Sequence, residues 1–542
     1  MKNFFFKKLF IILGAILLIL IGGGFVAVDY LDNYLKQKIT ASINENKESP
    51  YRIEIENISV WLFPTNITLE KVKVRTDSLL AEKKGKPKAK IDVEKVAFKG
   101  VNIFKYFSDG EWYADKIRLQ NPVIDIKYIA DSTQGVSRAA DTVANFVVAP
   151  LSVSSLEIQN LTGVYQYNSN SRIELKKLDL EIDDARWLKP PTFRFSSEKV
   201  QVSFEQLNHK TADFLQKVDT LNGTLNAVSF DTSYVDVLRF SEAQLLISNY
   251  SMAHQNGTNF KIEEINYENN LVKVKNLELS QDLDEKREIK AQQLEAHNLD
   301  WQALQRELIK ADKILIFNPD ISILKDRNRH GEPNEKKMPY EWKIGLAIDT
   351  LQIEKGNIVY SERAEGLDGI GSLAFDSLNM MALNFHNFEE SQPAKIKADM
   401  YFMKESRIEI AMEMPLNTDT FEGSIKGFCT EIEIPSLNKM LSPITRFEAN
   451  RGVIRRAEFD ANINDGYATG TFIITYDGLE VTLLKKNSNK KRKFLSGLIN
   501  TVIDKNVEGK EGKIKYQREY NDSLLRYVWR VIRSGLITSM LP

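Results

Sequence analysis

The sequence is poor in the residues that most often carry chemistry. Of its 542 residues one is cysteine and five are histidine. A single cysteine excludes an intramolecular disulfide, and Cys429 is expected to be a small buried apolar side chain. The histidines are widely separated, so none of them belongs to a pair or cluster with metal-ligand spacing. We therefore predict no metal site and no cofactor.

An excess of charge of either sign is also missing. The 73 Lys and Arg residues balance 74 Asp and Glu residues, which removes the basic excess that nucleic-acid binding normally needs. The sequence contains neither GxSxG nor GxxxxGK[ST], and the glycines of residues 366–371 do not complete GxGxxG. With so many carboxylates, neighbouring acids arise by chance. No catalytic residue and no enzyme activity are predicted.

Long hydrophobic runs are absent except at residues 9–28, which contain no charge. At about 1.5 Å per residue this run spans about 30 Å, the thickness of a hydrocarbon core. A membrane anchor is predicted, with the apolar residues Leu9, Leu13, Ile16, Leu20 and Val28. A cleaved signal peptide is the alternative, although its apolar part is normally only about 7 to 15 residues long.

The charges beside this run predict its orientation. Lys2, Lys7 and Lys8 precede it, whereas Asp29 and Asp32 follow it, so the positive-inside rule places the N-terminus in the cytoplasm and the rest outside it. The expected topology is a single pass.

Beyond residue 50 the apolar residues alternate with polar ones. Examples are Ile53-Glu-Ile55, Val72-Lys-Val74 and Ile91-Asp-Val93, a pattern typical of strands with one buried face. A mainly antiparallel sheet is predicted. The best helical candidates within it are residues 212–218 and 301–309. The charged segments 82–90 and 325–337 are predicted to be hairpin loops, and residues 131–149 are either a loop or a helix.

A duplicated motif interrupts this alternation. Ala114-Asp-Lys-Ile-Arg-Leu-Gln-Asn-Pro122 recurs as Ala311-Asp-Lys-Ile-Leu-Ile-Phe-Asn-Pro319, and Leu156-Glu-Ile158 corresponds to Leu351-Gln-Ile353. Asn-Pro favours a turn or bulge between two stretches of strand. Two repeat units are therefore predicted, and repeats that each add strands to one sheet lengthen it. The apolar positions of the two motifs are Ile117, Leu119, Ile124 and Ile126, and Ile314, Ile316, Ile321 and Ile323.

The apolar face of such a sheet has to be covered, because few amphipathic helices are predicted. One possibility is that the sheet curls and fills its interior with its own side chains. The other is that it leaves a trough for acyl chains, which at about 0.8 kcal/mol per buried methylene need no specific contact. In that case the eight isoleucine and leucine positions above line the groove.

The C-terminal segment combines basic and apolar residues. A basic cluster that includes Lys490, Lys491, Arg492 and Lys493 precedes an apolar stripe at residues 494–503. Residues 524–540 repeat the spacing of four, with Arg526, Arg530 and Arg533 on another side. Basic amphipathic helices suit anionic lipid headgroups, which these seven cations are predicted to contact. Two helices that cap the end of the sheet are the alternative.

The order of these features resembles the AsmA-like family of Gram-negative envelope proteins. The similarity rests on the lysine-flanked anchor, a short helix, and the strand-Pro-strand opening of residues 51–64 and 66–74, YRIEIENISVWLFP and NITLEKVKV. The resemblance implies an inner-membrane protein whose body lies in the periplasm. It also implies a non-enzymatic function, in which a β-groove conducts phospholipid or another acyl lipid toward the outer membrane, with an envelope protein as a further partner. The alternative is an assembly or scaffolding protein that binds other chains along its sheet edges.

The expected fold is an N-terminal transmembrane helix followed by an elongated, twisted antiparallel β-sheet groove of tandem repeats, with short C-terminal amphipathic helices. The expected segments are a cytoplasmic N-terminus (1–8), the anchor (9–28), an amphipathic helix and linker (29–50), two β-groove repeat units (51–255 and 256–484) and a basic tail (485–542).

Overall fold

The computed structural model describes most of the chain after residue 49. The described residues are 50–62, 65–102, 112–127, 151–188, 194–231, 238–282, 285–328, 344–365, 369–388, 392–416, 421–445, 447–483, 504–519, 522 and 524–540. They form two compact units: unit 1 is residues 1–255 with 261–270 and 305–307, and unit 2 is residues 256–260, 271–304 and 308–542. The predicted anchor and the basic cluster at 490–493 lie outside the described residues.

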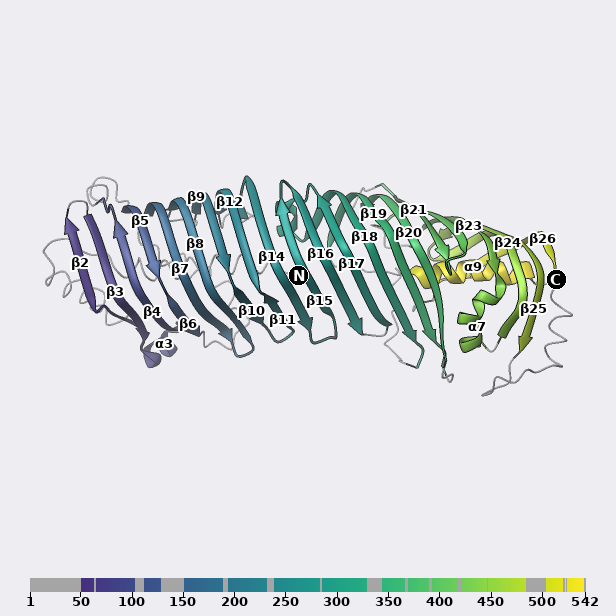
Figure 1. Ribbon diagram of the computed structural model, residues 1–542, viewed down its shortest axis with the longest axis horizontal. Coiled ribbons are helices and arrows are strands. Elements are labelled where there is room, and N and C mark those ends of the chain that lie inside the picture. The colour runs from purple at the N-terminus through teal and green to yellow at the C-terminus, as the bar shows by residue number, and fades with distance from the viewer. Residues whose placement is uncertain are drawn as a thin grey trace. The chain divides into compact units, whose positions relative to one another are not determined.

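Unit 1 consists almost entirely of strands (Figure 1). It holds one short described helix, α3 (Ser78–Lys84), which begins at the N-cap Asp77 and ends at Gly85 in a left-handed conformation. Its strands are β1 (Tyr51–Glu54), β2 (Asn57–Leu62), β3 (Thr65–Thr76), β4 (Lys88–Lys99), β5 (Trp112–Gln120), β6 (Val123–Lys127), β7 (Leu151–Asn168), β8 (Ser171–Leu188), β9 (Arg194–Phe204), β10 (Gln206–Lys210), β11 (Phe214–Val218), β12 (Thr220–Asp231), β13 (Leu238–Arg239), β14 (Glu242–His254) and most of β15 (Asn259–Glu268).

Unit 2 combines long strands with several helices. The helices are α6 (Trp301–Gln305), the 3-10 turn η1 (Ile434–Leu437), α7 (Asn438–Thr445) and α9 (Leu524–Met540). The strands are β16 (Leu271–Asp282), β17 (Glu285–His297), β18 (Leu308–Asp326), β19 (Gly345–Arg363), β20 (Ile370–His386), β21 (Ala394–Phe402), β22 (Ser406–Met414), β23 (Gly423–Glu433), β24 (Phe447–Asn464), β25 (Tyr467–Leu483) and β26 (Val507–Gln517).

The prediction of a mainly β protein is confirmed, and most neighbouring strands are antiparallel. Each unit also contains one parallel junction, where β5 and β6 pair with β7 and where β18 pairs with β19. Parallel neighbours need a crossover connection rather than a hairpin. The prediction of a hairpin loop at residues 325–337 is therefore wrong, because this segment leads from β18 to its parallel neighbour. The segment at 82–90 joins antiparallel strands, with part of α3 inside it.

The parallel junctions occur at the duplicated motif. Ile117 pairs with Leu156 and Leu119 with Ile158 in unit 1; in unit 2 the corresponding pairs are Ile314 with Leu351 and Ile316 with Ile353. The repetition seen in the sequence is therefore a repetition of β-structure, with the same strand, the same parallel neighbour and the same register.

The predicted bulge at the Asn-Pro steps is not found, because strand pairing continues through both steps without a register shift. Instead Asn121 and Asn318 have left-handed backbones, with φ of 49° and 47°. The alternation of buried and exposed side chains reverses at this level, and it does so in the neighbouring strand as well, so the strands bend together and stay in register. Ile117 and Ile124 can therefore share a face although their numbers differ in parity, and so can Ile314 and Ile321.

Neighbouring strands carry left-handed residues at the same level. In unit 1 they include Lys71, Asn160 and Lys177, and in unit 2 Asn276, Lys355 and Ser377. Side chains at this level interact across neighbouring strands. In unit 1, Asn121 donates to Glu94 at 2.5 Å and accepts from Asn160 at 2.8 Å. The left-handed residues thus divide the long strands into two straight segments, or arms, and the sheet bends where the arms join.

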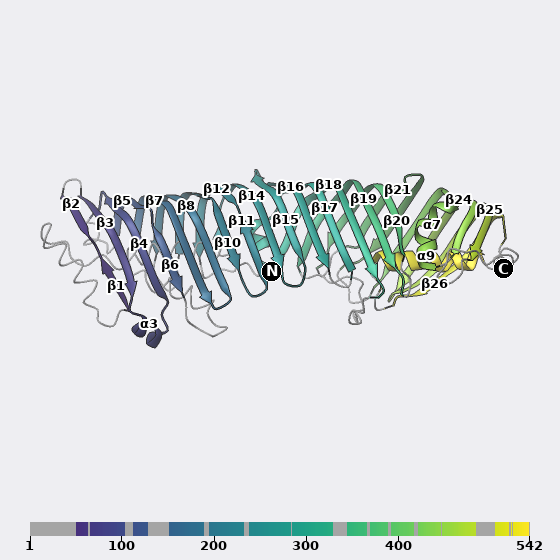
Figure 2. The same ribbon diagram turned by 60° about the horizontal axis from the view of Figure 1, so that its bottom comes forward.

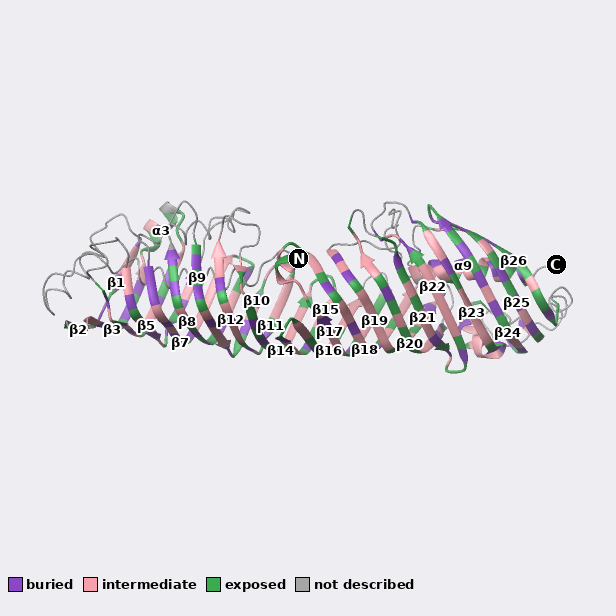
Figure 3. Cartoon of the chain, turned by 90° about the horizontal axis from the view of Figure 1, so that it is seen from above, coloured by how far each residue is buried: buried purple, intermediate pink, exposed green. Residues whose placement is uncertain are grey.

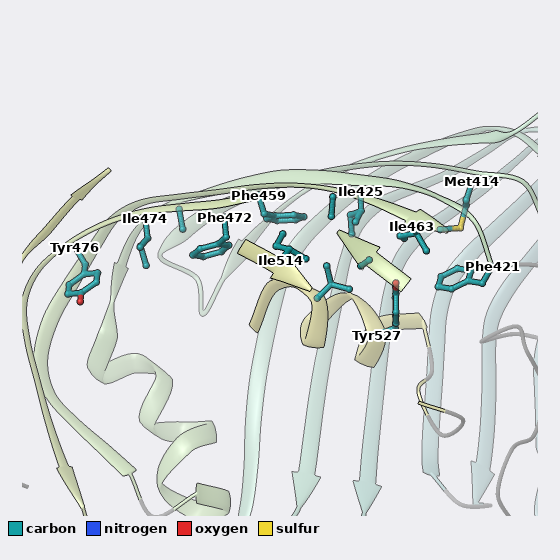
Figure 4. Close-up of a cluster of buried hydrophobic side chains, with 14 of the residues drawn as sticks. Met414, Phe421, Ile425, Phe459, Ile463, Phe472, Ile474, Tyr476, Ile514 and Tyr527 are labelled. Atoms are coloured by element: carbon teal, nitrogen blue, oxygen red, sulfur yellow. The ribbon is translucent and has the colours of Figure 1, made fainter. Parts of the chain in front are cut away.

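Two helices pack on the apolar face of unit 2. The short helix α7 contacts β19, β20 and β24, and α9 lies against β25 and β26 (Figures 1 and 2). Under α9 a cluster of buried side chains includes Phe459, Phe472, Ile514 and Tyr527 (Figure 4). The partly buried Cys429 packs beside it, and burial raises the pKa of this thiol to about 11.

The predicted helices have mixed outcomes. The helix at residues 524–540 is confirmed as α9, and α6 confirms the first part of the candidate at 301–309. The candidate at 212–218 is wrong: residues 214–218 form β11, which pairs with β10 and β14 on either side. Backbone pairing with two neighbours overrides the weak helical spacing there. Residues 494–503 lie outside the described part of the chain.

Candidate functional site: the apolar face of the sheet

Unit 1 directs one continuous set of apolar side chains to a single face. Its rows are Ile67, Phe98, Ile117, Leu156, Ile182, Val200 and Leu225 on one arm, and Val74, Ile91, Ile124, Gly163, Leu175, Leu207 and Val218 on the other. The predicted groove residues all lie in or beside these rows and are buried. Ile117 is 2% exposed, Leu119 1%, Ile124 3% and Ile126 6%.

In unit 2 the register of the strands also aligns apolar side chains in rows on one face. One row is Val274, Leu294, Ile316, Ile353, Met380, Ala398 and Ile410, and the row beyond the bend is Leu279, Ile289, Ile321, Ile358, Phe375 and Phe402. The predicted residues Ile314, Ile316, Ile321 and Ile323 lie on this face, and each is only partly buried.

This partial burial reflects the lack of a covering helix. Among the described elements, no helix makes extensive contact with β16, β17 or β18, whereas α7 packs on β19, β20 and β24 and α9 packs on β25 and β26. Figure 3 shows the contrast: buried positions stripe the strands of unit 1, while β16 to β19 are coloured mainly as intermediate. The open part of the face is therefore β16 to β18, which we call the open apolar face.

Charged groups border the open apolar face where its strands end. Glu285, Lys325 and Glu362 are neighbours in register on β17, β18 and β19. Glu285 binds Arg287 at 2.9 Å and Lys325 at 3.7 Å, and Glu362 pairs with the guanidinium of Arg327. We call these five residues the charged rim. It places both signs of charge beside exposed hydrocarbon.

Tyr360 lies between the rim and the apolar rows. Its hydroxyl donates to Glu362 at 3.4 Å. Burial and the negative charge of Glu362 raise the pKa of Tyr360, so its hydroxyl stays neutral. The side chain can contact hydrocarbon with its ring and a polar group with its hydroxyl.

The equivalent border in unit 1 is uncharged. Tyr165, Ile173, His209, Gln216 and Met252 are successive neighbours there. His209 is buried and bonds Tyr167 at 3.1 Å through Nε2 and Gln216 at 3.2 Å through Nδ1. Its two ring nitrogens are thus occupied by neutral partners.

Unit 2 also contains a hollow of about 940 Å³ that spans β19 to β25. Nine of the residues that line it are charged, but Ile353, Met380 and Ile410 of the apolar row line it too. Arg407 binds Glu409 at 2.6 Å, and Arg456 lies over the ring of Phe428 at 5.0 Å. The charged part of this lining does not suit acyl chains.

The three arginines predicted to contact headgroups differ in their exposure and in their ion-pair partners. Arg526 and Arg530 both lie 3.3 Å from the carboxylate of Asp522, which is 1% exposed, and Arg530 also pairs with Glu519. Arg533 alone of the three is exposed. The contact of these arginines with headgroups stays a prediction, but two of them already neutralise acids of their own chain.

The tyrosine beside them completes an internal network. The Tyr516 hydroxyl donates to Asp522 at 2.6 Å and accepts from Arg530 at 2.6 Å. Burial raises the pKa of Tyr516 to about 12, so the hydroxyl remains a donor at neutral pH. The network ties the start of α9 to β26.

Sequence reasoning missed the charged rim. Its residues are ordinary members of alternating strands, and only the register of three strands brings Glu285, Lys325 and Glu362 together. The sequence did contain one indication. Each of these three residues lies two or four positions from an apolar-face residue of its own strand, and residues at even spacing in a strand share a face.

No groups of three or more potential metal ligands occur within the described ranges. Of the helices in those ranges, none has both the length and the apolar character needed to cross a bilayer. No protein-family model matches the chain, and no curated protein matches it. The resemblance to the AsmA-like family therefore stays a prediction.

Proposed function

We propose that this protein binds phospholipid, or another acyl lipid, on the open apolar face of unit 2 and moves it without chemical change. In this proposal residues 9–28 anchor the chain in the inner membrane, the body lies in the periplasm, and the lipid passes toward the outer membrane. The observation that carries the proposal is the partial burial of Ile314, Ile316, Ile321 and Ile323 on a face without a described helical cover.

The energetics favour an apolar occupant. Leaving several large aliphatic side chains in contact with water costs roughly 25 cal/mol for each Å² of apolar surface. Acyl chains laid along the rows would remove that cost without specific contacts. The charged rim suits a zwitterionic or anionic headgroup, because Lys325 and Arg327 can approach a phosphate while their acids keep the rim near neutrality.

The test is photocrosslinking from single positions of β18 in the full chain. A photoreactive residue at Ile321 or Ile316 should capture phospholipid from cells, and the product should be identified by mass spectrometry. Matched controls on the same strand are Asp320 and Ser322, whose side chains point to the opposite face and should capture none. Capture of protein alone from every apolar-face position would contradict the proposal.

A second candidate function is scaffolding through a sheet edge. In its described pairings β2 bonds only to β3, and its sequence Asn57–Leu62 contains no charge. Trp61 on it is 70% exposed. The last strand, β26, instead carries Lys510, Lys513 and Lys515, and lysine on an edge strand discourages pairing.

An uncharged edge of six residues can accept an extended peptide as an added strand. Crosslinking from Ser59 should then trap a polypeptide, whereas crosslinking from Lys513 should not. If Ser59 gives no protein adduct in cells, this second function is excluded.

A further inference from the structure

Helix α9 has two opposite stripes of different character. Tyr527, Val531 and Gly535 follow one another at spacing four and are buried against the sheet. Gly535 lies so close to Phe472 and Ile514 that a Cβ atom would overlap them. This stripe fixes the helix to β25 and β26.

The outward stripe is unusual for a helix that packs on a sheet. It consists of Trp529, Arg533 and Ile537, again at spacing four, and Trp529 is 42% exposed and Ile537 43%. The solvent side of such a helix normally carries charged residues. Here two large apolar side chains flank one cation.

The charge of this surface is positive. Residues 524–540 include three arginines and no acid. Asp522 and Glu519 bind Arg526 and Arg530, which leaves Arg533 as the cation of the outward stripe. An aromatic, an aliphatic and a basic residue in one line match the interfacial region of a bilayer, in which apolar side chains enter the headgroup layer and arginine contacts phosphate.

We infer that the outward stripe of α9 docks on the surface of an anionic lipid bilayer. The helix lies in the plane of the headgroups, with Trp529 and Ile537 inserted and Arg533 beside a phosphate, while its opposite side stays on the sheet. One arginine and two apolar residues give weak and reversible attachment. The inference is independent of the proposed function, because it does not require any lipid on the open apolar face.

The test is quenching of tryptophan fluorescence by brominated lipids, with the full chain and vesicles of phosphatidylcholine with or without phosphatidylglycerol. Trp529→Phe should remove a large part of the quenching seen with phosphatidylglycerol vesicles. Trp61→Phe is the matched control, because Trp61 is also exposed but lies in unit 1. Its loss should leave the quenching of the other tryptophans unchanged.

The electrostatic part is tested by Arg533→Glu, which should lower the affinity for phosphatidylglycerol vesicles about tenfold and leave that for phosphatidylcholine vesicles nearly unchanged. Circular dichroism and the urea midpoint verify that each variant is folded. Equal quenching in Trp529→Phe and in the unaltered chain would overturn the inference, as would insensitivity of Arg533→Glu to lipid charge. A stripe that binds a protein instead would give both of these results.

Discussion

The duplicated motif forms the same β-structure in the two units, but its apolar side chains differ in burial. In both, an ADKI strand with a left-handed asparagine before proline lies beside a parallel neighbour in the same register. Ile117 and Leu119 are nevertheless sealed from solvent, whereas Ile314 and Ile316 are partly exposed. A repeat therefore determines where apolar side chains point, but not whether they are covered. In unit 1 these side chains are buried in the packed core, and in unit 2 they are partly open to solvent.

The largest expected effect comes from truncating equivalent residues. Ile117→Ala should lower the free energy of unfolding by about 3 kcal/mol, because it leaves a cavity in a packed core. Ile314→Ala should cost only about 1 kcal/mol, because part of that side chain already contacts water. Urea unfolding of the full chain measures both, with Ile117→Val and Ile314→Val as milder controls. Equal losses at the two positions would abolish the distinction between the units.

The next effect concerns the part of unit 2 that α9 covers. Gly535→Val should displace α9, since a side chain there overlaps Phe472, and the docking of the helix should weaken by about 2 kcal/mol. The covered rows would then resemble the open apolar face and should bind a hydrophobic dye. Ser534→Ala, one residue away, should not increase dye fluorescence. If Gly535→Val also leaves it unchanged, α9 is not a cover that can be removed.

A smaller effect is expected at the left-handed asparagines of the two motifs. Asn121→Val and Asn318→Val each place a β-branched residue in a left-handed backbone, at a cost of about 1 to 2 kcal/mol. Asn121 should be the more sensitive, because its side chain makes two hydrogen bonds, to Glu94 and Asn160, whereas that of Asn318 makes one, to Gln292. Thermal unfolding checks this, with Asn→Gly at each site expected to cost less than Asn→Val. A larger loss at Asn318 would contradict the ranking.

The smallest expected effect is a difference between the two units in how their stability depends on pH. Glu157 pairs with Arg118 at 2.5 Å and with Lys116. Burial alone would raise the pKa of Glu157, but its hydrogen bonds to Arg118 and Lys116 outweigh burial and lower it. The aligned position of unit 2 is Gln352, which cannot titrate.

A lowered carboxyl pKa stabilises the folded chain above the unfolded value of about 4.3, and this contribution is lost as the pH falls through the folded value. Glu157→Gln should therefore remove about 0.5 to 1 kcal/mol of stability at pH 7. The same substitution should have almost no effect at pH 3. Urea midpoints at both pH values give the comparison, and an equal loss at pH 3 would exclude the ion pairs as its cause.

Much of the fold could be read from the alternation of residues. Val72, Val74, Ile91 and Val93 show period two plainly, and Asn-Pro marks the level at which the strands bend, although no bulge occurs there. The parallel junctions could not be foreseen, because alternation is the same for parallel and antiparallel neighbours. Residues 214–218 were mistaken for a helix because Phe214 and Val218 lie four apart, a spacing that short strands also contain.

The candidate site could be predicted only in part. The motif located Ile314, Ile316, Ile321 and Ile323 and placed them on one face. Their exposure depends on where α7 and α9 pack, which is a property of distant parts of the chain. For the same reason Arg526 and Arg530 could not be recognised from sequence as partners of Asp522.

The left-handed position at Asn318 also governs which changes of length the strand can tolerate, because β18 stays in register with β17 and β19 on both sides of it. Deleting one residue here while that pairing holds would move every later residue of β18 by one position, so that Ser322 and Leu324 would take the places of Ile321 and Ile323. Removing two residues would keep the sides as they are and only shorten the strand. Insertions and deletions of an even number of residues near the bend should therefore be tolerated. An odd number should exchange the apolar and polar faces of the later half of the strand.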